Sequence, residues 1–245
     1  MAEETQREHA ERLEQWAKEG KTGQPPILAA TVILLRDGPT GLETLMLKRN
    51  SKIVFGGMWV FPGGRLDAVD WHGVEEGDDL GASRRAASRE AMEESGLVVE
   101  PESMLPFAHW TPPPIQPKRF LTWFFAAKAG EGEVAIDDGE IKQSEWLSPR
   151  AALERQAAKE IELAPPTFVT LTDLMGFEAV EPALAAVADR TPERYATKIG
   201  VLDGIGPVSI WHGDAGYAEG DPNAPGARHR LTMAKGGPWT FERNG

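Results

Sequence analysis

Three glutamates lie close together in the middle of the chain, within the segment Arg89-Glu90-Ala91-Met92-Glu93-Glu94-Ser95-Gly96-Leu97. If this segment is helical, Glu90, Glu93 and Glu94 occupy positions i, i+3 and i+4 and present their carboxylates on one face. Like charges at this spacing destabilise a helix, and near its C-terminus the helix dipole also disfavours anions. A divalent cation would offset both effects, because Mg²⁺ and Mn²⁺ prefer carboxylate oxygens. The alternative is a solvated acidic helix end, and the glutamates alone do not decide between the two.

The elements that must position these glutamates are marked by hydrophobic patterns. A helix is predicted over residues 82–95, with Gly96 as its C-terminal cap. Upstream, the apolar, β-branched run Ile27–Leu35 predicts a strand that is buried on both faces. Glu43–Arg49 is expected to return as a second strand, and Trp59–Gly64 (WVFPGG) as a short strand stopped by proline and two glycines.

The rest of the chain alternates between further strand and helix patterns. RFLTWFFAAKA predicts a strand, Ser148 and Pro149 begin a helix, and helical patterns continue through residues 167–190. We therefore expect an α/β/α sandwich with a mixed sheet. The expected organisation is an N-terminal helix and linker (1–24), one domain with a helical extension (25–190), and a hairpin tail packed on the same domain (191–245).

Composition limits the function. The 245 residues contain no cysteine, which excludes disulfides and thiolate catalysis and leaves any metal to oxygen or histidine ligands. The five histidines show no metal-ligand spacing. A net charge of −12 argues against a nucleic-acid partner. No apolar run approaches the roughly 20 residues of a membrane span, and the charged N-terminus lacks a secretory pattern. A cytoplasmic location is therefore expected, and the negative charge does not exclude a small anionic substrate.

The glutamate segment resembles a known motif. R-E-A-M-E-E-S-G-L matches the second half of the Nudix box, R-E-U-x-E-E-x-G-U, where U is a bulky apolar residue, and the glycines of FPGG stand where the first half begins. Gly64 and Arg89 are 25 positions apart, about 11 more than in the family pattern, so the box is interrupted by an insertion. The family has a glutamate eight residues before the arginine, where this chain has Gly81. Asp78 or Asp79 is the expected substitute.

The resemblance implies a Nudix-type sandwich and a Mg²⁺- or Mn²⁺-dependent hydrolase that cleaves a diphosphate linkage. Glu90 and Glu94 would be the principal metal ligands, and Glu93 a further ligand or a base. The carbonyl of Gly64 commonly completes the metal shell in the family. The chemistry would be attack of water on phosphorus.

Two further sets of residues are expected at the site. Many family members use a glutamate from a loop before a tryptophan, which places Glu140, six residues before Trp146, in a catalytic role with Glu145 as its competitor. Phosphates are expected to bind arginines by bidentate hydrogen bonds, although each candidate could equally be a solvated residue at a strand end. The candidates are Arg49, Arg65 and Arg119. Trp59, Trp110 and Trp123 are candidates for stacking on a base, with a role in the core as the alternative.

The interrupted box and other segments resemble the peroxisomal coenzyme A diphosphatases. These segments are LMLKR, HWTPP with KRFLTWFF, and LAPPTFVTL, so the resemblance covers roughly residues 27–175. The upstream arginine of the coenzyme A signature is absent, with Lys52 alone available near its place. Coenzyme A or an acyl derivative is the first expected substrate, followed by nucleoside diphosphate sugars and dinucleotides. A non-catalytic ligand sensor or scaffold is the alternative of another class. Since family members are often dimers, a homodimer stays open.

Overall fold

The computed structural model describes residues 25–50, 57–114, 119–136 and 139–244, together with Glu11 and Gln15, both of which are helical. Apart from these two residues, the predicted N-terminal helix and its linker lie outside the described residues, as do Lys52 and Lys118. None of the helices in the described part of the chain is long and apolar enough to cross a membrane.

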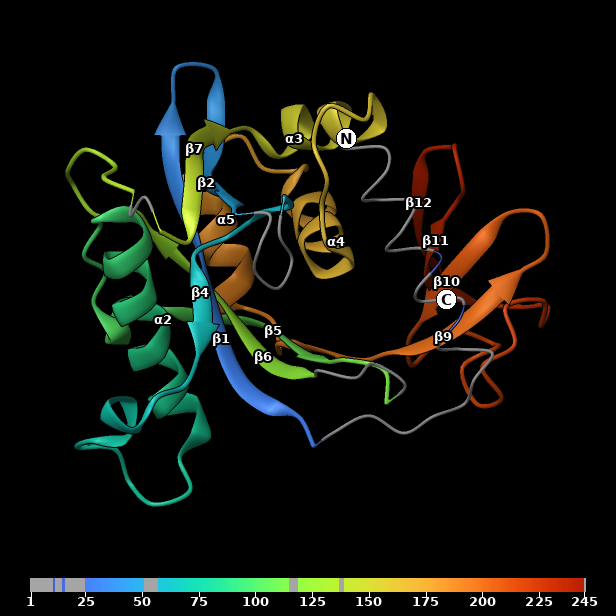
Figure 1. The fold of residues 1–245 in the computed structure, drawn as a ribbon, viewed down its shortest axis with the longest axis horizontal. Coiled ribbons are helices and arrows are strands. Elements are labelled where there is room, and N and C mark those ends of the chain that lie inside the picture. Colours follow the sequence, from blue (N-terminus) through green and yellow to red (C-terminus); the bar gives the residue numbers. More distant parts are fainter. Residues whose placement is uncertain are drawn as a thin grey trace.

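The elements follow one another in the order shown in Figure 1. The strands are β1 (Ile27–Gly38), β2 (Gly41–Arg49), β3 (Trp59–Val60), β4 (Gly63–Arg65), β5 (Leu105–Thr111), β6 (Phe120–Lys128), β7 (Ile141–Leu147), β8 (Glu193–Ala196), β9 (Lys198–Leu202), β10 (Gly206–Ile210), β11 (Arg228–Met233) and β12 (Trp239–Asn244). The helices are α2 (Asp79–Ser95), α3 (Pro149–Ala157), α4 (Pro165–Leu174) and α5 (Val180–Ala188), with short 3₁₀ turns η1 (Ala68–Trp71) and η2 (Pro101–Ser103).

Eight strands form the main sheet in the order β3-β2-β1-β6-β5-β8, with β4 paired to β1 and β7 to β2. The pairs β1–β6 and β5–β8 are parallel, and the other pairs are antiparallel. The sheet is therefore mixed. Such a sheet fits a chain in which helices and strands do not alternate regularly.

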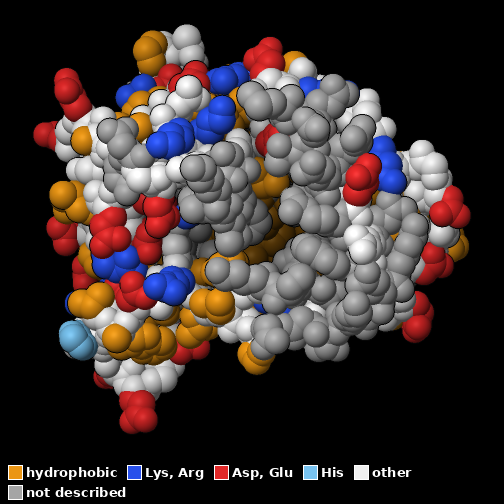
Figure 2. Space-filling view, in the orientation of Figure 1, with side chains coloured by type: hydrophobic (Ala, Val, Ile, Leu, Met, Phe, Trp, Pro, Cys, Tyr) orange, Lys and Arg blue, Asp and Glu red, His pale blue; other side chains and the backbone are white. Residues whose placement is uncertain are grey.

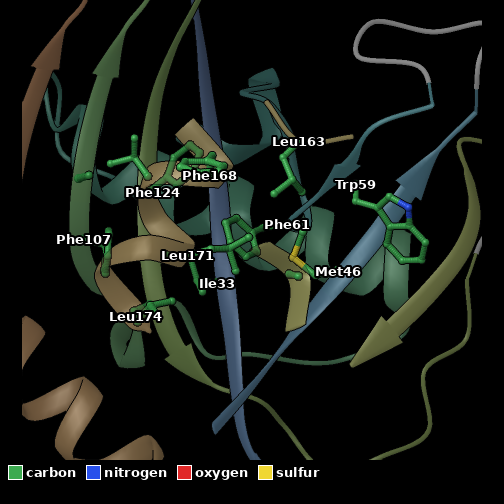
Figure 3. Packing of buried hydrophobic residues seen from close by; sticks show 14 of the residues in the cluster. Ile33, Met46, Trp59, Phe61, Phe107, Phe124, Leu163, Phe168, Leu171 and Leu174 are labelled. Atoms are coloured by element: carbon green, nitrogen blue, oxygen red, sulfur yellow. The ribbon is translucent and has the colours of Figure 1, made fainter. Parts of the chain in front are cut away.

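Both faces of the main sheet are buried because successive side chains of a strand point to opposite sides. Along β1, Ala30, Val32 and Leu34 pack with the alanines of α2, whereas Ile33 and Leu35 join the core beneath the later helices. Figure 3 shows this second core, where Ile33 and Met46 of the strands lie among Phe168, Leu171 and Leu174 of α4. The predicted α/β/α sandwich is confirmed, with α2 on one face and α3, α4 and α5 on the other.

The helix that carries the glutamates is confirmed and begins three residues earlier than predicted. The side chain of Asp78 caps its N-terminus by accepting a hydrogen bond from the amide of Gly81 at 2.9 Å. Gly96 ends it in the left-handed conformation (φ 72°), which glycine adopts without a steric penalty. The predicted start of α3 is also correct, with Ser148 as its cap and Pro149 in its first turn.

Three predictions about strands were wrong or incomplete. The glycines of FPGG do not stop a strand but begin β4, which pairs with β1. The segment before Trp146 is a strand, β7, rather than a loop, and only Glu140 lies in the turn that precedes it. The tail is not a single hairpin: after β8, residues 198–244 form a separate antiparallel sheet in the order β12-β11-β10-β9. Its two additional turns are residues 203–205 and 234–238, in which Gly204 and Gly236 have a positive φ.

Candidate active site

The three glutamates of α2 face the short strand β4. Glu94 is buried, at 4% exposure, and its Oε2 accepts a hydrogen bond from the amide of Gly63 at 2.9 Å. Its Oε1 is also buried and has no hydrogen-bond partner. The carboxylate of Glu90 lies so close to Gly64 that a Cβ atom at that position would collide with it. A side chain at position 64 would therefore displace the Glu90 carboxylate from its place beside β4.

Glu93 lies at the outer edge of this face. Its side chain is 58% exposed and pairs with Arg89, which also pairs with Glu90. The three carboxylates of the i, i+3, i+4 set therefore differ in exposure to solvent: Glu94 is buried, Glu90 is half-buried and Glu93 is exposed. Such a graded row places acceptor oxygens at several depths along one wall.

Arg89 is held by an aspartate that the sequence analysis did not single out. Asp70, in turn η1 within the inserted loop, is 3% exposed and accepts two hydrogen bonds from the Arg89 guanidinium, at 3.1 and 2.9 Å. These bonds raise the pKa of Arg89, although burial opposes them. The expected substitutes, Asp78 and Asp79, do not take this place, because both belong to the start of α2. Nothing in the loop sequence distinguishes Asp70 from its other acidic residues.

Arg49, at the end of β2, lies between two carboxylates. One guanidinium nitrogen is 2.8 Å from Glu140, and the other is 3.6 Å from Oε1 of Glu94. Glu145 is directed elsewhere, because it pairs with Arg155 of α3 at 2.8 Å. Of the two competing glutamates, the structure therefore brings Glu140 to the carboxylate face.

A cavity of about 720 Å³ opens beside these residues. Its lining includes Glu90, Glu93, Glu94, Glu140, Gly64, Arg49 and Arg65, which are seven of the predicted site residues. Arg119 is not among its described lining residues, and its guanidinium donates to the carbonyl of Pro112. Figure 2 shows a hollow near the centre of this face, with hydrophobic side chains on the part of its wall that is visible.

The candidate tryptophans divide between the core and the cavity. Trp59 is buried beneath the guanidinium of Arg155, and Trp123 packs on the ring of His109 at 4.4 Å. Trp110 lines the cavity but is only 4% exposed. The structure thus gives all three mainly a packing role.

Burial changes the protonation of the two inner glutamates. Removal from water raises the pKa of Glu94 to about 7, although the Gly63 amide and Arg49 oppose the shift. Burial also raises the pKa of Glu90, against the effect of Arg89. Both shifts reflect carboxylates whose charge is incompletely compensated by the protein itself.

The oxygen ligands at this face have the chemistry that a hard divalent cation requires. Among the described residues, no three His, Asp or Glu side chains are already gathered closely enough to surround an ion. Arg89 and Arg49 account for this, since their guanidinium groups occupy oxygens of Glu90, Glu93 and Glu140. The buried Oε1 of Glu94 accepts no hydrogen bond, although Arg49 lies 3.6 Å away, and it nevertheless offers an acceptor for a cation. The donor set therefore fits a hard divalent cation.

Comparison with known proteins identifies the family. The NUDIX domain profile matches residues 25–168, more than half of the chain. A Caenorhabditis elegans protein named as nudix hydrolase 7 is 27% identical over 184 residues, which span 60% of this chain and 59% of that protein. The match therefore covers about three fifths of the relative's length.

The first of two solved structures compared with the chain shows the same fold. A NUDIX hydrolase from Alicyclobacillus acidocaldarius superposes with a TM-score of 0.59 and 24% identity, covering 66% of this chain and 96% of that one. A MutT NUDIX hydrolase from Burkholderia pseudomallei gives a TM-score of 0.47 at 20% identity, covering 61% and 98%. The domain match over residues 25–168 shows that the chain belongs to the Nudix family, whose hydrolases generally use divalent metal ions.

Proposed function

We propose that this protein is a metal-dependent hydrolase that cleaves the diphosphate linkage of a nucleotide-derived small molecule, with coenzyme A or an acyl derivative as the favoured substrate. The observation that carries the proposal is the placement of Glu90, Glu93 and Glu94 on one wall of the cavity, where the buried Oε1 of Glu94 has no hydrogen-bond partner. An acidic helix end without function would instead expose its carboxylates to water.

Each carboxylate has a proposed role. Glu90 and Glu94 would hold Mg²⁺ or Mn²⁺ with the carbonyl of Gly64, and Glu93 would be a further ligand or a base. When bound, the metal neutralises phosphate charge and lowers the pKa of a water molecule. Glu140, at the cavity edge, would orient or deprotonate the attacking water.

Arg49 and Arg65 would hold the phosphates, since both line the cavity beside the carboxylates. The reaction adds one water across the P–O–P linkage, so that one phosphorus gains a hydroxyl group and the other product leaves as a phosphomonoester. Coenzyme A would yield 4′-phosphopantetheine and adenosine 3′,5′-bisphosphate. Nucleoside diphosphate sugars and dinucleotides are the next candidates.

A ligand sensor or scaffold without catalysis is the alternative of another class. The intact segment Arg89–Leu97 argues against it, because proteins that keep only the fold have no need for a buried carboxylate beside a cavity. A membrane or nucleic-acid partner is not proposed, and a homodimer stays a proposal.

The substrate proposal predicts a difference between two closely related compounds. Coenzyme A carries a 3′-phosphate that dephospho-coenzyme A lacks, and a dianion of this kind normally requires arginine or lysine. We expect kcat/KM for coenzyme A to exceed that for dephospho-coenzyme A by roughly tenfold or more. Steady-state assays with products identified by mass measure this ratio. Equal values would show that the 3′-phosphate is not recognised, and no cleavage of either would favour sugar or dinucleotide substrates.

Asp70 is predicted to act as a positioning residue through Arg89. Asp70→Asn removes the charge that orients the guanidinium, so Arg89 should shift toward Glu90 and Glu93 and compete for their oxygens. We expect the Mg²⁺ affinity or kcat to fall by about 10- to 100-fold, as is typical for partners of metal ligands. Asp78→Asn is the matched control, since it alters a helix cap of the same loop and should affect mainly stability. A metal titration that is the same for Asp70→Asn and wild type would refute the role.

The raised pKa of Glu94 predicts that protons and metal compete for the site. Without metal, the folded protein keeps this proton up to about pH 7, whereas the unfolded chain releases it near 4.5, the ordinary pKa of a glutamate. This group therefore makes the fold less stable as pH rises through that window. Because a metal binds the carboxylate, the rise in Tm caused by Mg²⁺ should be larger at pH 8 than at pH 6. Glu94→Gln should remove most of that pH dependence, and an equal rise at both pH values in the wild type would contradict the account.

A further inference from the structure

The cavity has two walls of different character. Its charged lining residues come from the ends of β2 and β4, from α2 and from the turn before β7. The C-terminal sheet supplies the opposite wall, with Thr197, Ile199, Ser209 and Trp211, none of which is charged. In Figure 1, α2 lies at the left of the molecule and β9 and β10 lie at the right. These four residues lie beyond the matched domain, residues 25–168, so the family resemblance does not account for them.

The C-terminal sheet is fixed firmly to the main domain. Trp110 of β5 stacks on Tyr195 of β8, with ring centroids 3.9 Å apart, and the edge of Trp211 meets Trp110 at 5.7 Å. The indole nitrogen of Trp211 donates to Thr197 at 2.9 Å. On the far side, Trp239 packs on Phe168 of α4 at 5.5 Å. A wall held by this much aromatic packing keeps its position relative to the glutamates.

The exposed surface of this half of the cavity is mostly aliphatic and hydroxyl-bearing. The faces of Trp110 and Tyr195 cover one another, and Trp211 is fully buried, so these rings present no open face for a base to stack on. The partly exposed apolar groups are instead Ile199, Phe120 and two prolines at the start of α4, Pro165 and Pro166. Hydroxyl groups of Thr122 and Thr197 lie among them. This surface suits a flexible, uncharged chain with a few amide groups better than a sugar or a second phosphate.

We infer that the C-terminal sheet forms the binding wall for an uncharged, largely aliphatic arm of the diphosphate substrate, of the acyl-pantetheine class, and that Ile199 determines specificity for it. The inference rests on the proposed function, because the diphosphate must lie at the charged wall for the arm to reach this one. A cavity of about 720 Å³ accommodates both parts, since sites for ligands of this size span roughly 300–1,000 Å³.

Two measurements on the full chain test the inference. The first is the ratio of kcat/KM for octanoyl-coenzyme A to that for acetyl-coenzyme A, with Mg²⁺. The second is the binding of octanoyl-pantetheine, which has no diphosphate, followed by tryptophan fluorescence. Each methylene group buried on binding is worth roughly fourfold in affinity, so the wild type should prefer the octanoyl substrate by at least tenfold.

The variants place a charge on the proposed wall or away from it. Ile199→Asp should reduce both the substrate ratio and the affinity for the fragment by at least about tenfold. Ile199→Thr keeps the β-branched shape of the strand residue and should give a smaller loss, which covers the case in which the aspartate variant fails to fold. Ile205→Asp is the control: this isoleucine of the same sheet is 44% exposed and does not line the cavity, so both readouts should stay at wild-type values.

The outcomes separate this inference from the proposed function. If coenzyme A esters are hydrolysed but the chain-length ratio is unchanged in Ile199→Asp and Ile199→Thr, the inference is wrong and the function stands. If no coenzyme A compound is hydrolysed, yet the fragment binds and Ile199→Asp weakens it, the substrate proposal is wrong and the apolar wall stands. The absence of saturable fragment binding to the wild type would also overturn the inference.

Discussion

Glu94→Gln should lower kcat by at least about 10²-fold, a loss of about 2.7 kcal/mol in transition-state stabilisation. Glutamine has the same shape but no charge, so it keeps an oxygen for the Gly63 amide and loses the anion that would hold a metal. At pH 8 the metal-free variant should be about as stable as the wild type, because the buried charge of Glu94 is itself costly. Activity would therefore be lost without loss of the fold, which steady-state kinetics and thermal melting measure together.

Two further glutamates provide the comparison for this result. Glu140→Gln should lower kcat by a smaller factor, about tenfold to 10²-fold, because its role is to place or deprotonate the water. Glu145→Gln removes an exposed ion pair with Arg155 that lies away from the cavity and should leave kcat unchanged. Normal activity in Glu94→Gln would eliminate the proposed mechanism. A larger loss of kcat in Glu145→Gln than in Glu140→Gln would assign the role of placing or deprotonating the water to Glu145 instead of Glu140.

Asp214→Asn should destabilise the protein by about 3–5 kcal/mol. Asp214 is fully buried beside Arg230, and its two oxygens accept from that guanidinium at 2.6 Å each. They also accept the backbone amides of His229 and Gly216. Asparagine would turn an NH₂ group toward donors that need an acceptor and would leave the buried charge of Arg230 unbalanced.

Urea denaturation measures this loss, with Asp203→Asn as the control because Asp203 is exposed in the turn between β9 and β10. Burial alone would raise the pKa of Asp214, but hydrogen bonds from Arg230 and the two amides lower it to about 2. The pair's contribution is therefore complete above the unfolded value of 3.8 and is lost as pH falls through about 2. A loss below about 1 kcal/mol in Asp214→Asn would show that the C-terminal sheet does not depend on this pair.

The strongest patterns in the sequence predicted the centre of the fold. β1 was recognisable because a strand buried on both faces has a nearly continuous apolar run, and α2 because Gly96 ends it. β7 was not predicted because it lacks a clear hydrophobic pattern. Only Ile141 and Leu147, at its ends, are buried, whereas Lys142, Gln143 and Glu145 are exposed, as is common in strands near a sheet edge. The strands of the C-terminal sheet are five or six residues long, and their pairing depends on turns rather than on a long hydrophobic pattern.

Those parts of the candidate site that lie within one helix could be predicted from the sequence. Contacts between residues of different elements could not. Glu90, Glu93 and Glu94 share a face because helix geometry fixes their spacing. The ion pair of Asp70 with Arg89 joins two elements through an inserted loop, and no local rule selects one acidic residue of that loop. The role of Arg119 stays a prediction for the same reason: an arginine at a strand end has the same sequence pattern whether it binds a phosphate or, as in the structure, donates to a backbone carbonyl. The uncharged wall around Ile199 is distant in sequence from the glutamates that it faces.

The central claim is that a carboxylate-bound divalent cation supports attack of water on a diphosphate. The most direct measurement offers the protein coenzyme A, acyl-coenzyme A, nucleoside diphosphate sugars and dinucleotides in ¹⁸O-labelled water, with Mg²⁺ or Mn²⁺, and identifies the products by mass. The account predicts two phosphorylated products from at least one of these substrates, with a single ¹⁸O on one of them. It also predicts that chelation of the metal or Glu94→Gln abolishes their formation. No cleavage of any substrate by the wild type with metal, or undiminished cleavage by Glu94→Gln, would contradict it.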